Sequence, residues 1–196
     1  MKIIGVCGSS GSGKSTVCRC FQNRGVPVLD CDEIYHKLVN APSACLQEIG
    51  EQFGFDMIQG GTLDRKKLGA IVFADRSKLE RLNEISHRHV IFELDKIILS
   101  LQANGFTACA IDAPMLFEAG LDERCDFVVA VIADKQVQID RICRRDGIEK
   151  EQAEKRICNQ ISSEKLKARA DFILENNGTK EDLIRVCNEL LDTILP

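Results

Sequence analysis

The chain has 196 residues, of which 44% are hydrophobic, and its formal net charge at neutral pH is −4. This length suffices for one core with an appended lobe, and it is too short for two ordinary independent domains. The acidic balance argues against nucleic acid or an anionic membrane surface as the main partner, because both favour an excess of Lys and Arg.

The apolar segments are too short for a membrane protein. None approaches the roughly 20 residues that span a bilayer, and the apolar start is broken by Gly5 and already belongs to a strand pattern. We therefore expect a cytoplasmic protein without a membrane partner.

The chain contains ten cysteines but no Cys-x-x-Cys pair. Most of them lie inside apolar or amphipathic patterns, where a thiol behaves as a small hydrophobic group. We expect reduced cysteines. A zinc site is the more specific alternative, but no two Cys/His pairs have the spacing of zinc-finger ligands.

A glycine-rich segment, residues 8–15, matches the pattern Gly-x₄-Gly-Lys-Ser and lies between an apolar run and a helical pattern. Glycines allow backbone N–H groups to turn toward a polyphosphate, the lysine meets the outer phosphates, and the serine hydroxyl binds Mg²⁺. The following helix directs its positive end at the same phosphates. This pattern predicts a nucleotide-binding loop formed by Gly8, Gly11, Ser12, Gly13, Lys14, Ser15 and Thr16, with Lys14 also catalytic.

Two aspartates follow a second apolar run, residues 27–29. The carboxyl ends of strands form the ligand edge of an open α/β sheet. Asp32 could accept a proton from an acceptor hydroxyl, while Asp30 could cap the next helix or support the site. In an extended segment the two side chains would point to opposite sides. The alternative is that both are N-cap and first-turn residues of a helix.

Residues 34–103 carry apolar residues at helical spacing and no run that could join a sheet, so they predict an all-helical insertion. Its Arg65 follows a helix-capping Asp64, and His87 begins the cluster 87–89. Together these residues supply positive charge that a phosphorylated acceptor would need. For the cluster, a solvated helix face is the alternative.

The second half of the chain resumes strand patterns at 106–111, 127–132 and 171–174. Asp112 closes the first of them, a position like that of a Walker-B aspartate, which would hold Mg²⁺ directly or through water. Arg141 and Arg145 stand four residues apart on one helix face and would repel unless an anion lies between them. They predict a clamp on the transferring phosphoryl group. The alternative is an ion-pair network with Asp146, Glu149 and Glu151.

The expected fold is α/β: a P-loop kinase fold with a five-stranded parallel sheet flanked by helices. Residues 1–33, 104–133 and 166–196 would form the nucleotide-binding core. The helical insertion, 34–103, would bind the acceptor, and a two-helix lid would occupy 134–165.

Several further motifs occur in a fixed order along the chain. Together with the loop, this order resembles the dephospho-coenzyme A kinase family over nearly the whole length. The matching segments are Asp30-Cys31-Asp32-Glu33-Ile34, residues 61–65, residues 71–75, Pro114-Met115-Leu116-Phe117-Glu118, Arg141, Arg145-Asp146-Gly147, Arg156, Gln160, Lys165 and Asn176-Asn177-Gly178.

The resemblance implies ATP-dependent phosphorylation of the ribose 3′-hydroxyl of dephospho-CoA, giving CoA and ADP, with Mg²⁺ as the metal. It implies Asp32 as the base and Asn177 and Gly178 near the adenine. It places Asp30, Arg65, His87 and Leu116 on the acceptor side. Small molecules would be the partners of a monomer or weak homo-oligomer. One departure is His87-Arg88, where the family usually has His-Pro.

Two other classes remain as alternatives. A nucleoside or shikimate kinase would share the fold, loop and lid, but the long insertion suits an extended acceptor. A P-loop GTPase is suggested by residues 179–182, which resemble the guanine-reading [Asn/Thr]-Lys-x-Asp motif. No Asp is followed by Gly three residues later, so the GTPase switch motif is missing.

Overall fold

The computed structural model describes residues 1–195, which fold into two compact units. We call the first the sheet unit; it comprises Met1–Leu29 and the chain from Gln102 onward. The second, Asp30–Leu101, is the helical unit. No helix in the described part of the chain combines the length and apolar character needed to span a bilayer.

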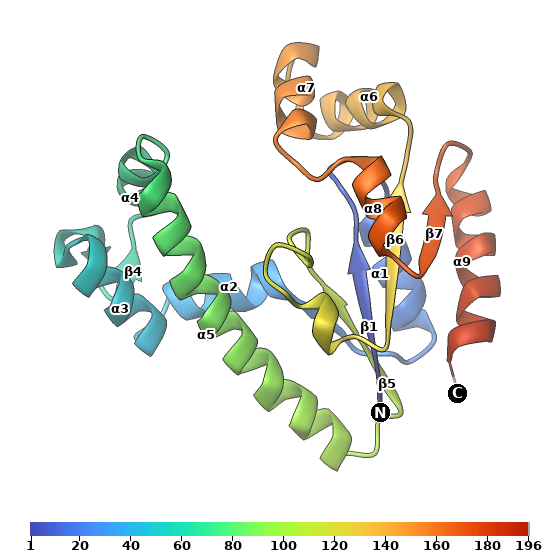
Figure 1. Ribbon diagram of the computed structural model, residues 1–196, viewed down its shortest axis with the longest axis horizontal. Coiled ribbons are helices and arrows are strands. Elements are labelled where there is room, and N and C mark those ends of the chain that lie inside the picture. Colours follow the sequence, from blue (N-terminus) through green and yellow to red (C-terminus); the bar gives the residue numbers. More distant parts are fainter. Residues whose placement is uncertain (196) are drawn as a thin grey trace. The chain divides into compact units, whose positions relative to one another are not determined.

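The sheet unit is built on a five-stranded sheet in the order β2-β5-β1-β6-β7 (Figure 1). Its central strand β1 pairs in parallel with β5 and β6, and β6 pairs in parallel with β7. Both faces are covered, so the central strands are apolar except at their ends, as parallel sheets require. The strands are β1 (Lys2–Cys7), β2 (Val28–Asp30), β5 (Ala108–Asp112), β6 (Phe127–Ile132) and β7 (Phe172–Glu175). The predicted five-stranded parallel sheet is confirmed.

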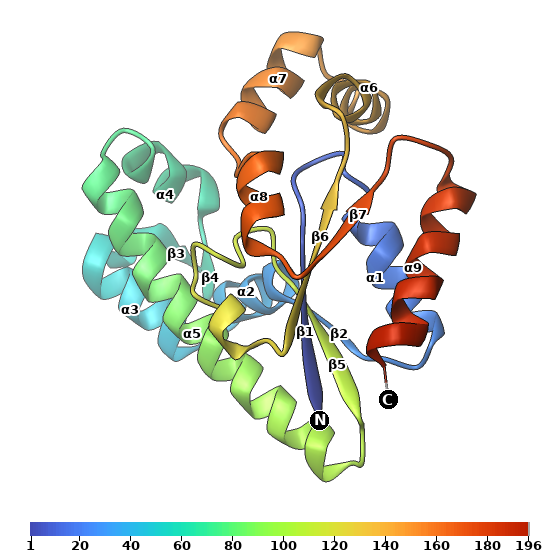
Figure 2. The ribbon, with the colours of Figure 1, turned by 45° about the vertical axis from the view of Figure 1, so that its right-hand side comes forward.

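Helices pack on both faces of this sheet. Helices α1 (Lys14–Asn23) and α9 (Lys180–Ile194) lie on one face and α8 (Ser163–Arg169) on the other, as Figures 1 and 2 both show. The fully buried Phe21 of α1 and Leu191 of α9 belong to one apolar cluster with Ile4 and Val129 of the sheet. This cluster fixes α1, and therefore the loop before it, against the carboxyl end of β1.

Two further helices, α6 (Lys135–Asp146) and α7 (Lys150–Cys158), lie beyond the carboxyl ends of the strands (Figure 2). They pack on each other through a small apolar cluster of their own, with Ile139, Ile142 and Ala153 at its centre. Gly147 joins them in a left-handed conformation at φ +65°. The pair corresponds to the segment predicted as a lid.

The helical unit contains α2 (Cys31–Val39), α3 (Ala44–Phe53), α4 (Arg65–Val72) and most of α5 (Arg76–Ala103). Its separate apolar core includes Ile49, Leu68 and Ile85. The two apolar patterns at 79–85 and 90–101 belong to one helix of 28 residues, because no Gly or Pro interrupts it.

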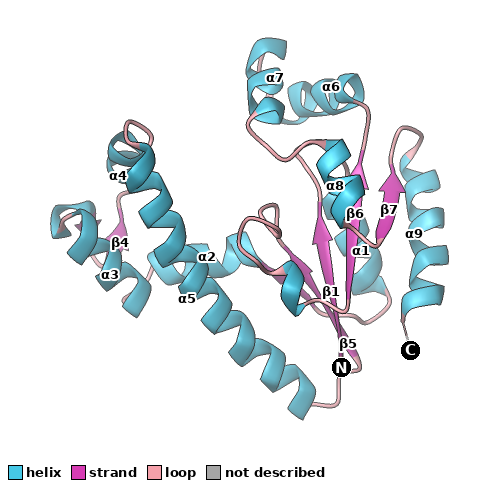
Figure 3. Cartoon of the chain, in the orientation of Figure 1, coloured by secondary structure: helices cyan, strands magenta, loops and turns pink. Residues whose placement is uncertain are grey.

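The expectation of an all-helical insertion was wrong in one respect. Strands β3 (Ile58–Gln59) and β4 (Thr62–Leu63) pair as an antiparallel hairpin between α3 and α4. Figure 2 labels both strands, and Figure 3 shows β4 as a short arrow among the helices. Gly60 and Gly61 form its turn at φ +58° and +80°, the positive angles that a two-residue hairpin turn needs at both positions. The Gly-Gly pair was a hairpin signal, but the flanking strands are only two residues long.

Candidate functional site

The phosphate-binding pattern forms a loop between β1 and α1. Gly11 and Gly13 adopt φ values of +78° and +103°, which side chains disfavour. Helix α1 starts at Lys14 without a side-chain cap and without an acidic residue in its first turn. Its first N–H groups and positive dipole end therefore suit an anion.

Lys14 forms an ion pair with Asp112, the last residue of β5. The strand register explains the meeting, since Asp112 pairs with Val6 of β1, two residues before the loop begins. The Cys18 thiol donates to the other carboxylate oxygen of Asp112 at 3.2 Å. The sheet thus brings the predicted lysine and the predicted Walker-B aspartate together.

The oxygen ligands near the loop fit Mg²⁺ only in part. The Asp112 carboxylate and the Ser15 hydroxyl are hard donors of the kind that Mg²⁺ prefers. Within residues 1–195, no group of three or more His, Cys, Asp and Glu side chains could hold a metal. The donor set therefore suits a Mg²⁺ ion that is shared with phosphate oxygens and water.

The two predicted clamp arginines have different partners. Arg141 donates to the carbonyl oxygens of Gly11 at 3.3 Å and Asn176 at 2.9 Å. Arg145 makes a two-point ion pair with Asp146 at 2.7 and 3.0 Å, and Arg156 binds the same carboxylate. These two arginines hold the pKa of Asp146 well below its usual range.

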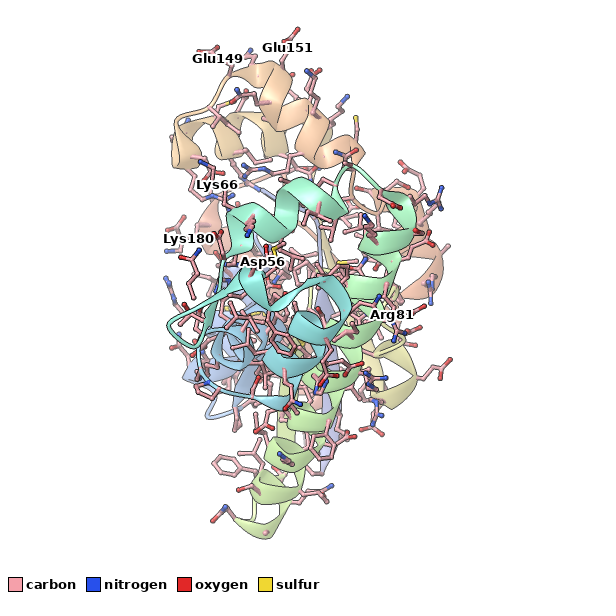
Figure 4. All side chains as sticks on the ribbon, turned by 90° about the vertical axis from the view of Figure 1, so that its left-hand side faces the viewer. Asp56, Lys66, Arg81, Glu149, Glu151 and Lys180 are labelled. Carbon is pink, nitrogen blue, oxygen red and sulfur yellow. The ribbon has the colours of Figure 1, made fainter. Side chains whose placement is uncertain are left out.

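The arrangement at Arg145 thus agrees with the alternative of a surface ion-pair network. Glu149 and Glu151, also considered for that network, project from the start of α7 (Figure 4). Arg141, in contrast, reaches from α6 to the phosphate loop, where it contacts the Gly11 carbonyl oxygen, and its role in binding ATP stays a prediction.

Two glutamines contact the start of the loop. The Gln138 amide, 2% exposed, donates to the Ser9 hydroxyl at 2.6 Å, and the Gln160 side-chain oxygen accepts from the Ser10 N–H at 2.9 Å. The sequence marked Gln160 only as a family match and did not mark Gln138. A signal was present, because Gln138 lies three residues before Arg141 on the same face of α6.

These glutamines also border a cavity of about 460 Å³ at the beginning of α6. Its wall includes Ser9 of the loop, Asp134 before α6 and Asn177 after β7. Asn177 accepts a hydrogen bond from the Asp134 N–H at 2.7 Å. The segment after β7 is therefore tied to the start of α6, close to the loop.

The segment that resembled a guanine-reading motif is the start of α9. Thr179 and Asp182 form a reciprocal capping box, in which each side chain accepts a hydrogen bond from the other residue's backbone N–H. The Asp182 carboxylate is therefore used to begin a helix.

In the helical unit, the two aspartates lie at the start of α2. Asp30 is the N-cap and accepts a hydrogen bond from the Glu33 N–H at 3.0 Å, and Asp32 lies in the first turn. The expectation of an extended segment was wrong, because α2 begins directly after β2. The helix-start alternative describes their backbone correctly, and it leaves the exposed Asp32 side chain on the surface.

The predicted acceptor-side cations lie among other charged residues that cover the helical unit, including Asp56, Lys66 and Arg81 (Figure 4). Arg65 lies 3.1 and 3.2 Å from the two ring nitrogens of His36. In the cluster 87–89, Arg88 and His89 both bind the Glu48 carboxylate, His89 at 2.8 Å. His87 is partly exposed on α5.

Leu116 differs from the other predicted acceptor residues because it is fully buried in the sheet unit. A Cβ atom at Gly5 of β1 would lie 2.8 Å from its side chain. Leu116 therefore packs beneath the central strand, and this structure gives it no surface for an acceptor.

Comparison with known proteins identifies the family. A family model described as dephospho-CoA kinase matches residues 2–182. The chain belongs to the dephospho-CoA kinase family. A dephospho-CoA kinase from Fusobacterium nucleatum is 39% identical over 201 residues, covering 98% of both chains.

Solved structures agree with this assignment. A dephospho-CoA kinase from Campylobacter jejuni aligns with a TM-score of 0.74 and 27% identity, covering all of this chain and 98% of that one. A Thermus thermophilus protein, TT1252, aligns with a TM-score of 0.84 and 31% identity over the same shares. The predicted family, P-loop kinase fold and reaction, the ATP-dependent phosphorylation of dephospho-CoA to CoA, are confirmed. The nucleoside, shikimate and GTPase alternatives are not favoured.

The sheet unit brings together most of the residues predicted for ATP. Lys14, Asp112 and Arg141 meet around the loop, and Asn177 and Gly178 follow the residue that Arg141 contacts. Three residues hold the loop from outside. Sequence reasoning did not mark Gln138, and it marked Asn176 and Gln160 only as family matches, without these contacts.

Proposed function

We propose that this protein transfers the γ-phosphoryl group of ATP to the ribose 3′-hydroxyl of dephospho-CoA, with the donor bound by the sheet unit and the acceptor by the helical unit. The observation that carries the proposal is the loop before α1, an uncapped helix start with Lys14 and Asp112 beside it. Such a site neutralises and positions a polyphosphate, and phosphoryl transfer depends on these two effects.

On the donor side, the N–H groups of the loop and of the first turn of α1 bind the phosphates, and Lys14 meets the outer ones. Arg141, Asn177 and Gly178 bind the adenosine part. Ser15 and Asp112 are the residues that would hold Mg²⁺, which when bound supplies positive charge to the phosphate oxygens. Arg145 leaves its partner Asp146 and stabilises the transferring group as charge develops.

On the acceptor side, Asp32 accepts the proton of the 3′-hydroxyl, and Asp30 supports it by capping α2. Arg65 and His87 bind the phosphate groups of the acceptor. The insertion 34–103 acts as the acceptor-binding part, 134–165 as the lid, and the remainder as the nucleotide-binding core. The protein works in the cytoplasm as a monomer or weak homo-oligomer.

The test is a panel of acceptors: dephospho-CoA, adenosine, shikimate, gluconate and none. ATP consumption is measured for each, and the phosphate of the product is located by phosphorus NMR. We expect dephospho-CoA to be preferred by several orders of magnitude, because its pantetheine arm supplies binding energy that orients the ribose. Comparable turnover of adenosine, or phosphate at another position, would refute the proposal.

A further inference from the structure

Asn176 follows β7 and is one of the few polar residues that the sheet unit buries; 5% of its surface is exposed. Its side-chain Nδ2 donates to the Ser12 carbonyl oxygen at 2.7 Å, and its Oδ1 accepts from Arg141 Nη2 at 3.2 Å. Both the hydrogen-bond donor and the acceptor of this buried amide therefore bond to residues of the predicted nucleotide site.

The contact with Ser12 determines the direction of a neighbouring group. In a trans peptide the carbonyl oxygen and the following N–H point in opposite directions, and residues 1–195 contain no cis peptide. The Ser12 carbonyl shares its peptide unit with the Gly13 N–H. Because Asn176 holds that carbonyl on the outside of the loop, the Gly13 N–H points away from Asn176.

The packing at Gly13 shows how closely the amide approaches the loop. A Cβ atom built on Gly13 would lie 2.2 Å from Asn176 Nδ2. Gly13 therefore has two reasons to be glycine, its φ of +103° and the amide that occupies the place of a side chain.

We propose that Asn176 is a positioning residue for the phosphate site: it fixes the Ser12–Gly13 peptide so that the Gly13 N–H faces the phosphates, and it ties Arg141 to the same peptide. This inference rests on the proposed binding of ATP by the loop. It separates Asn176 from its neighbours Asn177 and Gly178, which the resemblance assigns to the adenine.

The side chain must be asparagine for this role. Aspartate has the same shape and could still accept from Arg141, but its carboxylate would face the Ser12 carbonyl without a hydrogen to donate. Alanine would lose both contacts. In either variant Arg141 keeps its bond to the backbone carbonyl of residue 176, so that its position is largely retained.

The experiment measures the affinities of the purified protein and its Asn176→Ala and Asn176→Asp variants for ATP, inorganic tripolyphosphate and adenosine by calorimetry. Tripolyphosphate tests the loop without the nucleoside. We expect both variants to lose on the order of 10- to 100-fold in affinity for ATP and for tripolyphosphate, as for a buried hydrogen bond left unmade. Adenosine affinity should not change.

Asn188→Ala is the control, because it removes an asparagine amide of the same unit that bonds Arg24 and does not contact the loop. It should leave tripolyphosphate affinity nearly unchanged. An equal loss in Asn188→Ala, a loss confined to adenosine, or a lower Tm with unchanged affinities would overturn the inference.

Two further outcomes are distinguishable. If Asn176→Ala does not fold, the isosteric Asn176→Asp decides alone, and wild-type affinity in that variant refutes the role. If the wild-type protein binds neither ATP nor tripolyphosphate, the proposed function itself fails.

Discussion

The two units differ in the groups that we propose to bind phosphate. In the sheet unit the groups are backbone N–H groups of one short loop, and buried side chains such as Gln138 and Asn176 hold that loop from outside. In the helical unit they are long side chains at the surface, and Arg65 and Arg88 already contact His36 and Glu48. A rigid loop is preorganised for its ligand, whereas surface side chains must rearrange to bind.

This difference predicts that the most damaging single change lies in the sheet unit. Lys14→Ala should raise the activation free energy that corresponds to kcat/KM by about 3–4 kcal/mol, because it removes a fixed positive charge from the transferring phosphates. The same change leaves Asp112 without its ion-pair partner, so Tm must be measured as well. Steady-state kinetics with dephospho-CoA test the prediction, and a wild-type rate would disprove the assignment of the loop.

A substitution in the helical unit should have a smaller effect on activity, and it should change kcat without changing ATP affinity. Asp32→Asn should lower kcat about 100-fold, the lower end of what a general base supplies, while ATP affinity stays nearly constant. Asp30→Asn is the matched control, since asparagine caps a helix about as well as aspartate does. If Asp30→Asn reduced kcat more than Asp32→Asn, the base would have been assigned to the wrong carboxylate.

Removal of a positive charge from the predicted lid should destabilise the transition state more than the ground state. Arg145→Ala should raise the barrier by about 1.5–3 kcal/mol, as for a hydrogen bond to a charged group, and should weaken ATP binding less. The exposed neighbour Arg144 on the same helix serves as the control through Arg144→Ala. Equal kcat values for the two variants would show that Arg145 takes no part in phosphoryl transfer and serves only the ion-pair network with Asp146.

The buried cysteines of the two units should react alike with an alkylating reagent, because the difference between the units lies at their surfaces. Burial raises the pKa of Cys7 in the sheet unit to about 12 and that of Cys45 in the helical unit to about 11. At pH 8 both remain neutral thiols, with thiolate fractions of about 10⁻³ or less. Iodoacetamide followed by mass spectrometry should therefore label the exposed Cys158 first, and equally fast labelling of Cys7 would contradict this.

The same contrast explains what the sequence revealed. The phosphate loop is contiguous, so its glycines, Lys14 and Ser15 could be read from spacing alone, and the buried strands could be read from apolar runs. Asn176 could not be found in this way, because its role depends on β7 ending beside a loop that is 164 positions away in the sequence.

In the helical unit, residue types could be read from the sequence but their partners could not. It marked Arg65 and the cluster 87–89 as positive charge, but the pairing of Arg88 and His89 with Glu48 depends on the packing of α3 against α5. Asp30 is a typical N-cap residue and signals the start of α2, but the residues around Asp32 alone do not distinguish a helix start from an extended segment. Leu116 was expected at the acceptor because of its motif, and burial beneath Gly5 became visible only in the fold.

The central claim is that the sheet unit binds ATP and the helical unit binds dephospho-CoA. One calorimetric experiment tests it directly. ATP and dephospho-CoA are titrated separately into Lys14→Ala and Arg65→Ala. We predict that Lys14→Ala weakens ATP binding and leaves dephospho-CoA binding intact, and that Arg65→Ala does the reverse. Loss of ATP affinity in Arg65→Ala, with dephospho-CoA binding unchanged, would contradict the assignment of the acceptor to the helical unit.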